Sequence, residues 1–330
     1  MKNLNLLFCS AGKHGRIITY IKESLKDQVK IVATSNNRYI PALYCADKNY
    51  ILPDVKSESY LQELLEICEK ENINAITTML DVETEILSKN RNIFESKGIM
   101  VFVPYYETAK VCFDKYEMYK AFIAKGIKTI LTYDNINDFE EGRKLGKIDF
   151  PVFVKPRKGR GSVGARKIEN IAKLLEAYND DNSLIIQEYI CGDDIDVDVY
   201  VDAISKQPSA IFSKRKLMAS IGGTIQSISF IDKTLNEVVK NICAKFDFCG
   251  PIDMEFFKNN DSYILTEINP RFSAAVIHAF GCKVDFAKFM YNNINNIENK
   301  NEIGLYSEDV IMMKYDSAII IDKDKLAKEV

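Results

Sequence analysis

Short apolar runs alternate with amphipathic stretches over the first third of the chain. Four runs rich in leucine, isoleucine and valine predict buried strands, at residues 4–9, 29–34, 75–79 and 99–103. Residues 57–72 carry apolar side chains at the spacing of one helix face, and Asp81 opens a second expected helix that ends near Gly98. Strands that alternate with helices are typical of a parallel, Rossmann-like sheet, which we expect over residues 1–104.

Two features of this first unit could contact a ligand. Gly12 and Gly15 follow the first expected strand, but two glycines alone match a dinucleotide-binding loop weakly, so we expect only a tight turn. Asp81 and Glu83 follow the strand at 75–79, at the edge where open α/β sheets place ligand contacts. We expect both to be solvated loop acids.

A second pattern, near residue 260, predicts a β-hairpin, because two apolar runs flank polar residues 258–262. Side chains of a strand alternate between faces, so Glu267 and Asn269 point the same way, and Glu255 joins them if the strand register allows it. Carboxylate and amide oxygens suit Mg²⁺, and Arg271 follows as a cation near where phosphate would lie. The stretch predicts a magnesium site; the alternative is an exposed hairpin with solvated acids.

A glycine-rich loop separates strand-like runs at 151–155 and 165–168. The first run ends in Lys155, and glycine lets backbone N–H groups close on anionic oxygens, so the loop could be a flap over phosphate; the alternative is a mobile basic hairpin. It is not a P-loop, because no Gly-Lys-Ser/Thr opens a helix. The flap residues expected to contact phosphate are Arg157, Gly159, Gly161, Ser162 and Gly164.

Strict alternation from Ile195 to Val201 predicts a strand with Asp194, Asp196 and Asp198 on one face. We expect Asp196 and Asp198 to be solvated or salt-bridged. Residues 310–321, near the end of the chain, predict a closing strand pair.

The segment Glu-Ile-Asn-Pro-Arg at residues 267–271 resembles the magnesium strand of the ATP-grasp superfamily, in the branch that includes the synthetase halves of carbamoyl phosphate synthase. The flap with Lys155 and the segment 188–190 match the family in the order that it requires, and the resemblance covers nearly the whole chain. It implies a Rossmann-like preATP-grasp domain at 1–104 and a two-subdomain ATP-grasp fold. The first subdomain, with the glycine-rich lid, spans 105–190, and the second, with the magnesium site, spans 191–330.

The resemblance implies ATP and Mg²⁺ as cofactors, with two metal ions expected and Mn²⁺ able to substitute. Its metal ligands match Glu255, Glu267 and Asn269. Arg271 and Lys155 match catalytic positions, where Arg271 contacts phosphate or the acyl intermediate. Lys155 also contacts ATP phosphate, as does the residue that matches Lys115 at the start of a helix within 105–125.

The resemblance places six further residues at the nucleotide, and the first three of them form the adenine-binding linker. They are Glu188, Tyr189, Ile190, Asp194, Phe257 and Ile268. Asp194 matches the acid that binds the ribose hydroxyls. In the basic cluster at 213–216, the resemblance favours Arg215 over the two lysines as a substrate or phosphate contact.

The activity that the resemblance implies is ATP-dependent ligation of a small-molecule carboxylate to an amine through an acylphosphate, with release of ADP and phosphate. One alternative is phosphoryl transfer to a single substrate, as in a small-molecule kinase or a carbamoyl-phosphate-type synthetase. Another is a nucleotide-binding module without turnover. Ala274 and Ala275 stand where the family often has glycines, so substrate identity does not carry over.

Composition and charge limit the kinds of partner that we expect the chain to bind. The chain has 330 residues, 47% hydrophobic and 28% charged, which is typical of folded globular proteins. A net charge of -3 gives no general attraction to nucleic acid or anionic membranes, so we expect neither as a partner. No apolar run approaches the roughly 20 residues of a membrane-spanning helix. A homodimer is one expectation, because related proteins are often dimers.

The eight cysteines form no Cys-x-x-Cys pair, and a strand-like run follows Met1 without a cleavage site. We therefore expect reduced thiols and a cytoplasmic protein. His14 and His278 are the only histidines, and neither lies at ligand spacing from a cysteine or beside a nucleophile motif. Zinc sites and histidine-based triads are disfavoured, and we expect His278 to be a packed helix residue.

Overall fold

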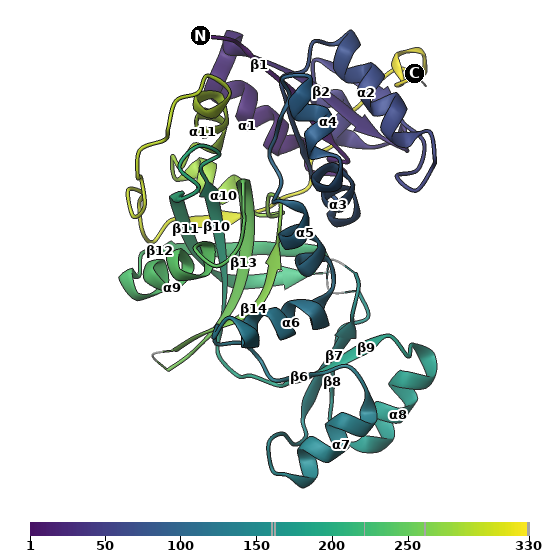
Figure 1. Cartoon of the computed structure of the whole chain (residues 1–330), viewed down its shortest axis with the longest axis vertical. Helices are drawn as coiled ribbons and strands as arrows, with labels where there is room; N and C mark the ends of the chain where they lie inside the picture. The colour runs from purple at the N-terminus through teal and green to yellow at the C-terminus, as the bar shows by residue number, and fades with distance from the viewer. Residues whose placement is uncertain (160, 162, 221, 261, 329–330) are drawn as a thin grey trace.

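The computed structural model of this α/β protein describes residues 1–328 apart from 160, 162, 221 and 261. Figure 1 shows three β-sheets along the long axis of the molecule, with the N-terminal sheet at the top and a small lobe at the bottom. A larger sheet lies between them. None of the helices in the described residues is both long and apolar enough to cross a membrane.

The N-terminal sheet has five parallel strands in the order β3-β2-β1-β4-β5, which confirms the predicted Rossmann-like arrangement. Its strands are β1 Leu4–Cys9, β2 Val29–Ser35, β3 Lys48–Ile51, β4 Ala75–Thr78 and β5 Met100–Val101. Its helices are α1 Gly15–Leu25, α2 Tyr60–Lys70, α3 Asp81–Lys89 and α4 Arg91–Ser96, with short 3-10 turns at Lys26–Gln28 and Pro41–Cys45. The single helix expected to end near residue 98 is therefore two helices.

Apolar side chains on both faces of β1 explain why this sheet lies in the interior. Phe8 packs with Ile17 of α1 on one face, whereas Leu7 packs with Leu64 of α2 on the other. A parallel strand covered on both faces needs a nearly continuous apolar run, which is the pattern that β1 carries.

Two helices connect the N-terminal sheet to the rest of the chain, α5 Tyr106–Phe113 and α6 Lys115–Ala124. The break between them is at Asp114, whose side chain accepts hydrogen bonds from the backbone N–H groups of Tyr116 and Glu117. This N-cap fixes Lys115 at the first turn of α6, where it can project away from the helix.

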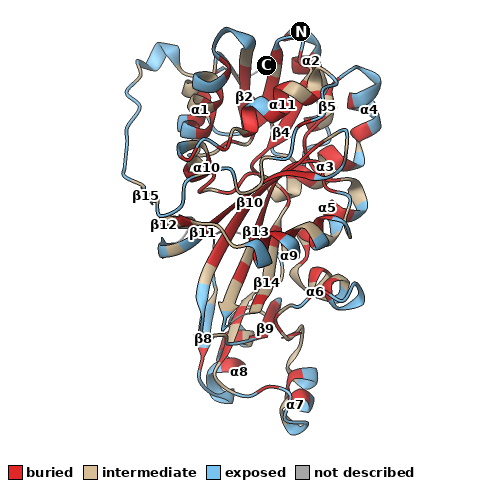
Figure 2. Cartoon of the chain, turned by 90° about the vertical axis from the view of Figure 1, so that its left-hand side faces the viewer, coloured by how far each residue is buried: buried red, intermediate tan, exposed pale blue. Residues whose placement is uncertain are grey.

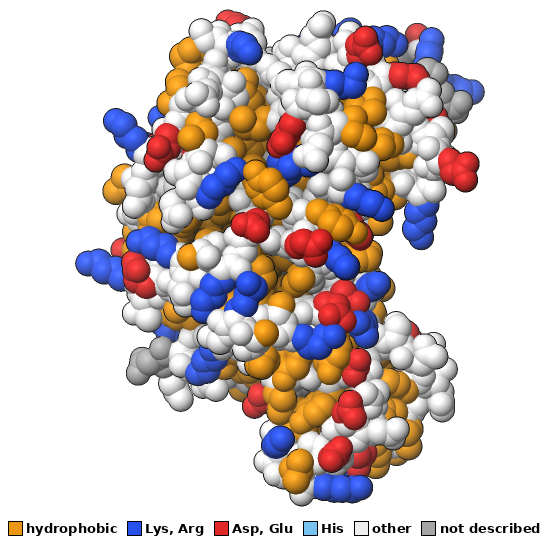
Figure 3. Space-filling view, in the orientation of Figure 1, with side chains coloured by type: hydrophobic (Ala, Val, Ile, Leu, Met, Phe, Trp, Pro, Cys, Tyr) orange, Lys and Arg blue, Asp and Glu red, His pale blue; other side chains and the backbone are white. Residues whose placement is uncertain are grey.

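The lobe contains a four-stranded antiparallel sheet in the order β6-β9-β7-β8. Its elements are β6 Thr132–Tyr133, α7 Ile136–Lys144, β7 Val152–Pro156, β8 Arg166–Ile168, α8 Ile171–Asp180 and β9 Leu184–Glu188. Phe139, Leu174 and Ile186 belong to its own small core. The space-filling view shows the lobe as a protrusion from the body of the molecule (Figure 3). The glycine-rich loop joins β7 to β8.

The central sheet has six antiparallel strands in the order β14-β13-β10-β11-β12-β15. Its strands are β10 Asp193–Val201, β11 Pro208–Ser220, β12 Gly223–Phe230, β13 Gly250–Asn259, β14 Ser262–Asn269 and β15 Ile311–Met313. The helices beside it are α9 Lys233–Cys243, α10 Ile277–Gly281 and α11 Phe286–Ile294. Figure 2 shows β10 and β13 buried over much of their length. The predicted hairpin at 258–262 is confirmed as the β13–β14 turn.

The end of the chain differs from the expectation of two closing strands. Only the three residues of β15 pair, with β12, and residues 314–322 form no strand. Tyr315 and Ile320 are 88% and 97% exposed to solvent. These apolar residues, which suggested a second strand here, are therefore not packed against the protein. Beyond a 3-10 turn at Lys323–Lys325, the carbonyl of Lys328 accepts a hydrogen bond from Ile51 in the N-terminal sheet.

Candidate active site

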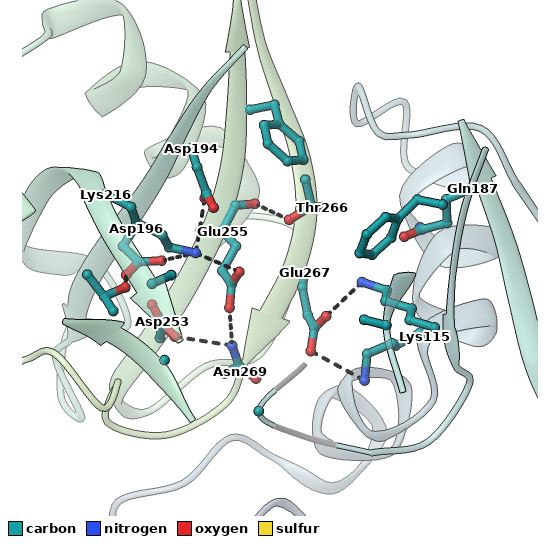
Figure 4. A pocket seen from close by; sticks show the side chains of 18 of the residues that line it. Lys115, Gln187, Asp194, Asp196, Lys216, Asp253, Glu255, Thr266, Glu267 and Asn269 are labelled. Carbon is teal, nitrogen blue, oxygen red and sulfur yellow. Dashed lines mark hydrogen bonds and ion pairs between the residues drawn. The ribbon is translucent and has the colours of Figure 1, made fainter. Parts of the chain in front are cut away.

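A cleft of about 580 Å³ lies between the small lobe and the central sheet. Side chains of β7, β9 and the glycine-rich loop line one side, and side chains of β10, β11, β13 and β14 line the other. Its volume falls in the range of small-molecule and cofactor pockets, roughly 300–1,000 Å³. Figure 4 shows ion pairs on both sides of this cleft.

The hairpin register gathers the three expected metal ligands. Glu255 on β13 lies directly opposite Glu267 on β14, and Asn269 lies opposite Asp253. Asn269 Nδ2 is 3.3 Å from Glu255 Oε1 and 3.1 Å from Asp253 Oδ2. Glu255, Glu267 and Asn269 all line the cleft, so hard oxygen ligands from two adjacent strands face one space.

Glu267 forms an ion pair with each of two lysines from the opposite wall. Lys155 Nζ, at the end of β7, is 2.9 Å from Oε2, and Lys115 Nζ, on α6, is 3.4 Å from Oε1. Burial alone would raise the pKa of Glu267, but Lys155 and Lys115 outweigh it and hold the pKa well below its usual range. The carboxylate is therefore charged and able to bind a cation.

A second cluster of charges surrounds Lys216 on β11. Its ammonium group lies 3.0 Å from an oxygen of each of Asp194, Asp196 and Glu255. Those three carboxylates come within 4.8 Å of one another, a spacing that could hold a metal ion. Burial alone would lower the pKa of Lys216, but Glu255, Asp196 and Asp194 raise it well above its usual value. Lys216 thus neutralises the acidic side of the cleft (Figure 4).

The donor set of the cleft fits Mg²⁺. Glu255, Glu267 and Asn269 offer carboxylate and amide oxygens, the ligands that this ion prefers. Asp253 also lines the cleft, and its buried Oδ1 has no hydrogen-bond partner among the described residues. A buried acid oxygen without a hydrogen-bond partner beside three candidate ligands fits a cation site.

Arg271 is held by an acid of the N-terminal sheet region. Its Nε lies 2.8 Å from Oδ1 of Asp81, at the start of α3, and both side chains are less than 20% exposed. Glu83 is buried and accepts hydrogen bonds from the hydroxyl groups of Tyr60 and Thr78. The expectation that Asp81 and Glu83 are solvated is therefore wrong, because α3 turns both acids toward protein partners.

The opposite end of the cleft has an apolar wall that could accept a flat ring. Phe153 and Ile130 line it from the lobe, and Phe257 lines it from β13. The expected linker residues Glu188, Tyr189 and Ile190 line the same cleft, as do Gly159, Gly161 and Asp194.

Two expected flap contacts do not line the cleft, and a third lies outside the described residues. Arg157 is not among the described residues that line the cleft. It instead pairs with Asp114 at 2.7 Å and with Glu117 at 3.1 Å, so it fastens the flap to α6. Gly164 does not line the cleft either. Ser162 lies outside the described residues.

Two expected contacts on the central sheet also point elsewhere. Ile268 alternates away from Glu267 into the core, and its backbone N–H lies 3.4 Å from Met118 Sδ. Arg215 is exposed on the face of β11 opposite Lys216, 3.6 Å from Asp193. The lysine that sequence reasoning ranked below Arg215 therefore reaches the cleft. Alternation along β11 could have found Lys216 if residues 213–216 had been recognised as strand.

Asp196 and Asp198 are buried and ion-paired rather than solvated. Asp198 pairs with the fully buried Lys214 at 2.5 Å, and Asp196 pairs with Lys216. His278 is buried in α10 and lies 2.8 Å from the hydroxyl group of Ser227, so the expectation that it is a packed helix residue is confirmed.

Most of the chain matches known protein families. A family model described as a PylC-like, N-terminal domain matches residues 6–102, and one described as an ATP-grasp domain matches residues 112–275. The arginine-specific large chain of carbamoyl phosphate synthase from Bacillus subtilis is 22% identical over 230 residues, which cover 65% of this chain and 22% of that protein. Tyramine–L-glutamate ligase from Methanocaldococcus jannaschii is 24% identical over 267 residues, 79% of this chain and 76% of that protein.

Other relatives match shorter regions. A D-alanine–D-alanine ligase from Flavobacterium johnsoniae is 36% identical over 104 residues, 29% of this chain and 31% of that protein. The chain thus spans less than a third of the length of this relative and of the synthase large chain.

Solved structures show the same fold. N5-carboxyaminoimidazole synthetase from Staphylococcus aureus, complexed with ADP, superposes with a TM-score of 0.77 at 16% identity, covering 96% of this chain and 83% of that one. L-amino acid ligase from Bacillus licheniformis gives a TM-score of 0.68 at 15% identity, covering 91% and 76%.

Proposed function

Because the chain belongs to the ATP-grasp superfamily, we propose that it is an ATP-dependent carboxylate–amine ligase that joins two small metabolites through an acylphosphate. The observation that carries this proposal is the arrangement of charges across the cleft. Lysines on both sides of the cleft neutralise acids of the central sheet that would hold a metal ion, so the cleft offers cations for phosphate from both walls and carboxylates for magnesium from one. The relatives include ligases that use carboxylates and amines by name.

ATP would lie with its base against the apolar wall of Phe153 and Phe257 and its phosphates toward Lys155 and Lys115. The linker residues Tyr189 and Ile190 would offer backbone groups to the base, and Asp194 would face the ribose. Lys115 and Lys155 would then exchange the Glu267 carboxylate for phosphate oxygens, which keeps both lysines paired.

Glu255, Glu267 and Asn269 would hold Mg²⁺, proposed as two ions with Mn²⁺ able to substitute, and Asp253 lies beside them. When bound, Mg²⁺ neutralises the triphosphate and keeps attacking and leaving oxygens in line. Lys216 would turn toward the transferred phosphoryl group, because its partner Glu255 would gain a metal counter-charge.

The reaction would need only positioned charges, since no nucleophilic side chain is required. A carboxylate oxygen of the substrate attacks the γ-phosphorus, and the bond to the ADP oxygen breaks. The amine then attacks the acyl carbon, loses a proton, and the C–O bond to phosphate breaks. Arg271, oriented by Asp81, would stabilise the negative oxygen that develops on the acyl carbon.

An ADP-release screen over paired carboxylates and amines tests this proposal. We expect release to require one member of each class, and Glu267→Gln to slow it by about 10²-fold or more, the range found when a charge-stabilising group is removed. The exposed Glu298→Gln removes the same charge outside the cleft and should leave the rate unchanged.

Two results would replace the ligase with another function. ADP release that needs a single substrate would indicate simple phosphoryl transfer, as in a small-molecule kinase or a carbamoyl-phosphate-type synthetase. Equal, slow ATP hydrolysis by the wild type and Glu267→Gln across the screen would indicate a nucleotide-binding module without turnover. A cytoplasmic location and a homodimer remain proposals alongside the activity.

A further inference from the structure

The end of the cleft beyond the candidate metal ligands is built from three segments far apart in sequence. Along β13, Phe257, Glu255 and Asp253 follow one another in steps of two residues away from the apolar wall. Beyond them the lining passes to residues 222–224 and 273–275. Here the backbones crowd together, because a Cβ added to Gly223 would lie 3.3 Å from Ala274 Cβ.

Two lysines from outside the central hairpin reach this end. Lys314, just after β15, donates a hydrogen bond from Nζ to the carbonyl oxygen of Ala274 at 2.8 Å. Lys13, in the loop after β1, places Nζ over Gly222, where an added Cβ would lie 3.1 Å from it. Ala274 and Gly222 both line the cleft, and the two lysines contact them without being among the described lining residues themselves, which places the ammonium groups at its rim.

These lysines differ from the other lysines of the cleft in having no acidic partner. Lys115, Lys155 and Lys216 each lie within ion-pair distance of a carboxylate. Among the residues that the structure describes, Lys13 and Lys314 have no carboxylate within 4.0 Å of Nζ.

Their mutual repulsion shows in Lys314. Burial lowers the pKa of Lys314 first, and the charges of Lys214 and Lys13 lower it further, to about 8, against a smaller opposing effect of Asp196 and Asp198. Two cations that repel each other at the rim of a cleft gain more from an anion than a single exposed lysine would.

We propose that Lys13 and Lys314 form a subsite for a second anionic group, a carboxylate or a phosphate, on the substrate whose reacting carboxylate lies at Arg271. This inference rests on the proposed function and narrows its substrate class. The substrate would be a small metabolite with at least two acidic groups, one activated and one held at the rim. Ala274 and Ala275 line this end of the cleft, so the part of the substrate between its two acidic groups would meet apolar side chains there.

Anion binding to the nucleotide-loaded protein tests the subsite without knowledge of the substrate. With the nonhydrolysable analogue AMPPNP and Mg²⁺ filling the triphosphate position, succinate and inorganic phosphate are titrated separately by calorimetry. We expect Lys13→Met/Lys314→Met to weaken binding of the preferred anion by about tenfold or more, the effect of losing charge-assisted hydrogen bonds. Mg-AMPPNP affinity should change less than twofold.

Matched variants separate the subsite from general electrostatics. Lys173→Met/Lys288→Met removes two exposed positive charges elsewhere and should leave anion affinity unchanged, whereas Lys13→Arg/Lys314→Arg keeps both charges and should retain most of it. If the double methionine variant does not fold, Lys13→Met alone serves, because its side chain is exposed. Tighter binding of succinate identifies a dicarboxylate, and tighter binding of phosphate identifies a phosphorylated acid.

Equal anion affinity in Lys13→Met/Lys314→Met and the Lys173→Met/Lys288→Met control would overturn the subsite. So would a wild-type protein that binds Mg-AMPPNP but neither anion, and in that case the proposed ligase still stands. A wild-type protein that does not bind Mg-AMPPNP would overturn the proposed function and the subsite with it.

Discussion

Both the N-terminal sheet and the central sheet bury acidic side chains, but they neutralise them in different settings. Glu71, after α2, is 1% exposed and pairs with Lys30 and Lys48 at 2.7 Å and 2.9 Å. Glu71 lines neither the cleft nor a small pocket of about 60 Å³ at the carboxyl ends of β1 and β2. The acids around Lys216 and Lys155 instead line a cleft about ten times larger.

Whether an ion pair is permanent or exchangeable depends on which groups can reach it. Glu71 is buried, although the side chains of Lys30 and Lys48 are 36% and 54% exposed, so removing its charge partners would leave a buried carboxylate uncompensated and the pair acts as structure. In a pair that lines a ligand-sized cleft, the lysine can bind a phosphate and the carboxylate can bind a metal ion, so neither charge is left unpaired and the net free-energy cost is small. The same residue types thus stabilise one half of the chain and prepare the other half for a ligand.

Of the substitutions considered, we expect Lys216→Met to have the largest effect, a loss in the rate of ADP release. Removing the ammonium group leaves Asp194, Asp196 and Glu255 as neighbouring like charges and, under the proposed function, would take a cation away from the transferred phosphoryl group. We expect ADP release to fall by about 10²-fold or more, equivalent to about 2.7 kcal/mol. Steady-state kinetics with the best substrate pair measures this.

Thermal melting gives a second test of Lys216→Met. The variant should melt below the wild type without Mg²⁺ and recover more of its melting temperature when Mg²⁺ is added, because the metal replaces the lost charge. Lys288→Met, on the exposed side of α11, is the control for a lost lysine. Full activity in Lys216→Met would mean that the cluster is as structural as the pair at Glu71.

Glu71→Gln is the matching change in the N-terminal sheet region, with an effect on stability instead of turnover. Burial would raise the pKa of Glu71, but hydrogen bonds from Lys30, Tyr50 and Lys48 outweigh it and lower the pKa to about 2. The lowered pKa means that the wild type gains stability above the unfolded pKa of about 4.5 and loses it as pH falls through about 2. At pH 7 we expect the substitution to cost about 2 kcal/mol in the free energy of unfolding.

Denaturant unfolding at several pH values checks this expectation. The difference between wild type and Glu71→Gln should be constant near neutrality and shrink below pH 4.5. Glu69→Gln, exposed on the same helix, should show little difference at any pH. A gap that persists unchanged at pH 2.5 would contradict the ionic account.

Asp81→Asn tests the contact that joins the two regions. Without the carboxylate, Arg271 keeps its carbonyl partner Phe272 at 3.0 Å but loses the charge that orients its Nε. We expect about a tenfold loss in kcat, or about 1.4 kcal/mol, because Arg271 is misaligned but still present. Affinity for Mg-ADP should change little, and Asp27→Asn, exposed in the same region, should have no effect on either quantity. A loss confined to stability would mean that Asp81 only fastens the regions together.

How far the sequence predicts this molecule depends on the length and regularity of each pattern. The apolar runs of β1 and β2 are buried on both faces and were predictable, whereas β3, Lys48–Ile51, is short and half polar and was missed. The sequence does not decide whether Glu255 lies opposite Glu267, and the reason is physical. A bulge between Glu255 and Phe256 shifts the β13–β14 pairing by one residue, so simple alternation from the turn does not decide which face Glu255 takes.

The missed site residues have partners that are distant in sequence. Lys214 and Lys216 suggested a solvated charge run, because nothing near residue 214 reveals Asp198 on the neighbouring strand. The role of Asp81 depends on Arg271, 190 residues away. Charge pairing across such separations is set by topology, which local patterns do not encode.

Arg215→Gln should have the smallest effect, and it sharpens the comparison within a single strand. Arg215 and Lys216 are adjacent on β11, but strand geometry sends their side chains to opposite faces, so only Lys216 lines the cleft. The one ion pair of Arg215 among the described residues is with Asp193 at 3.6 Å, and exposed pairs of this kind contribute about 0–1 kcal/mol. We therefore expect ADP release and stability to change less than about twofold, or 0.4 kcal/mol, in the assays that detect Lys216→Met. A loss comparable to that of Lys216→Met would mean that β11 turns its other face to the substrate during turnover, and that exposure in the ligand-free protein misleads about which cation acts.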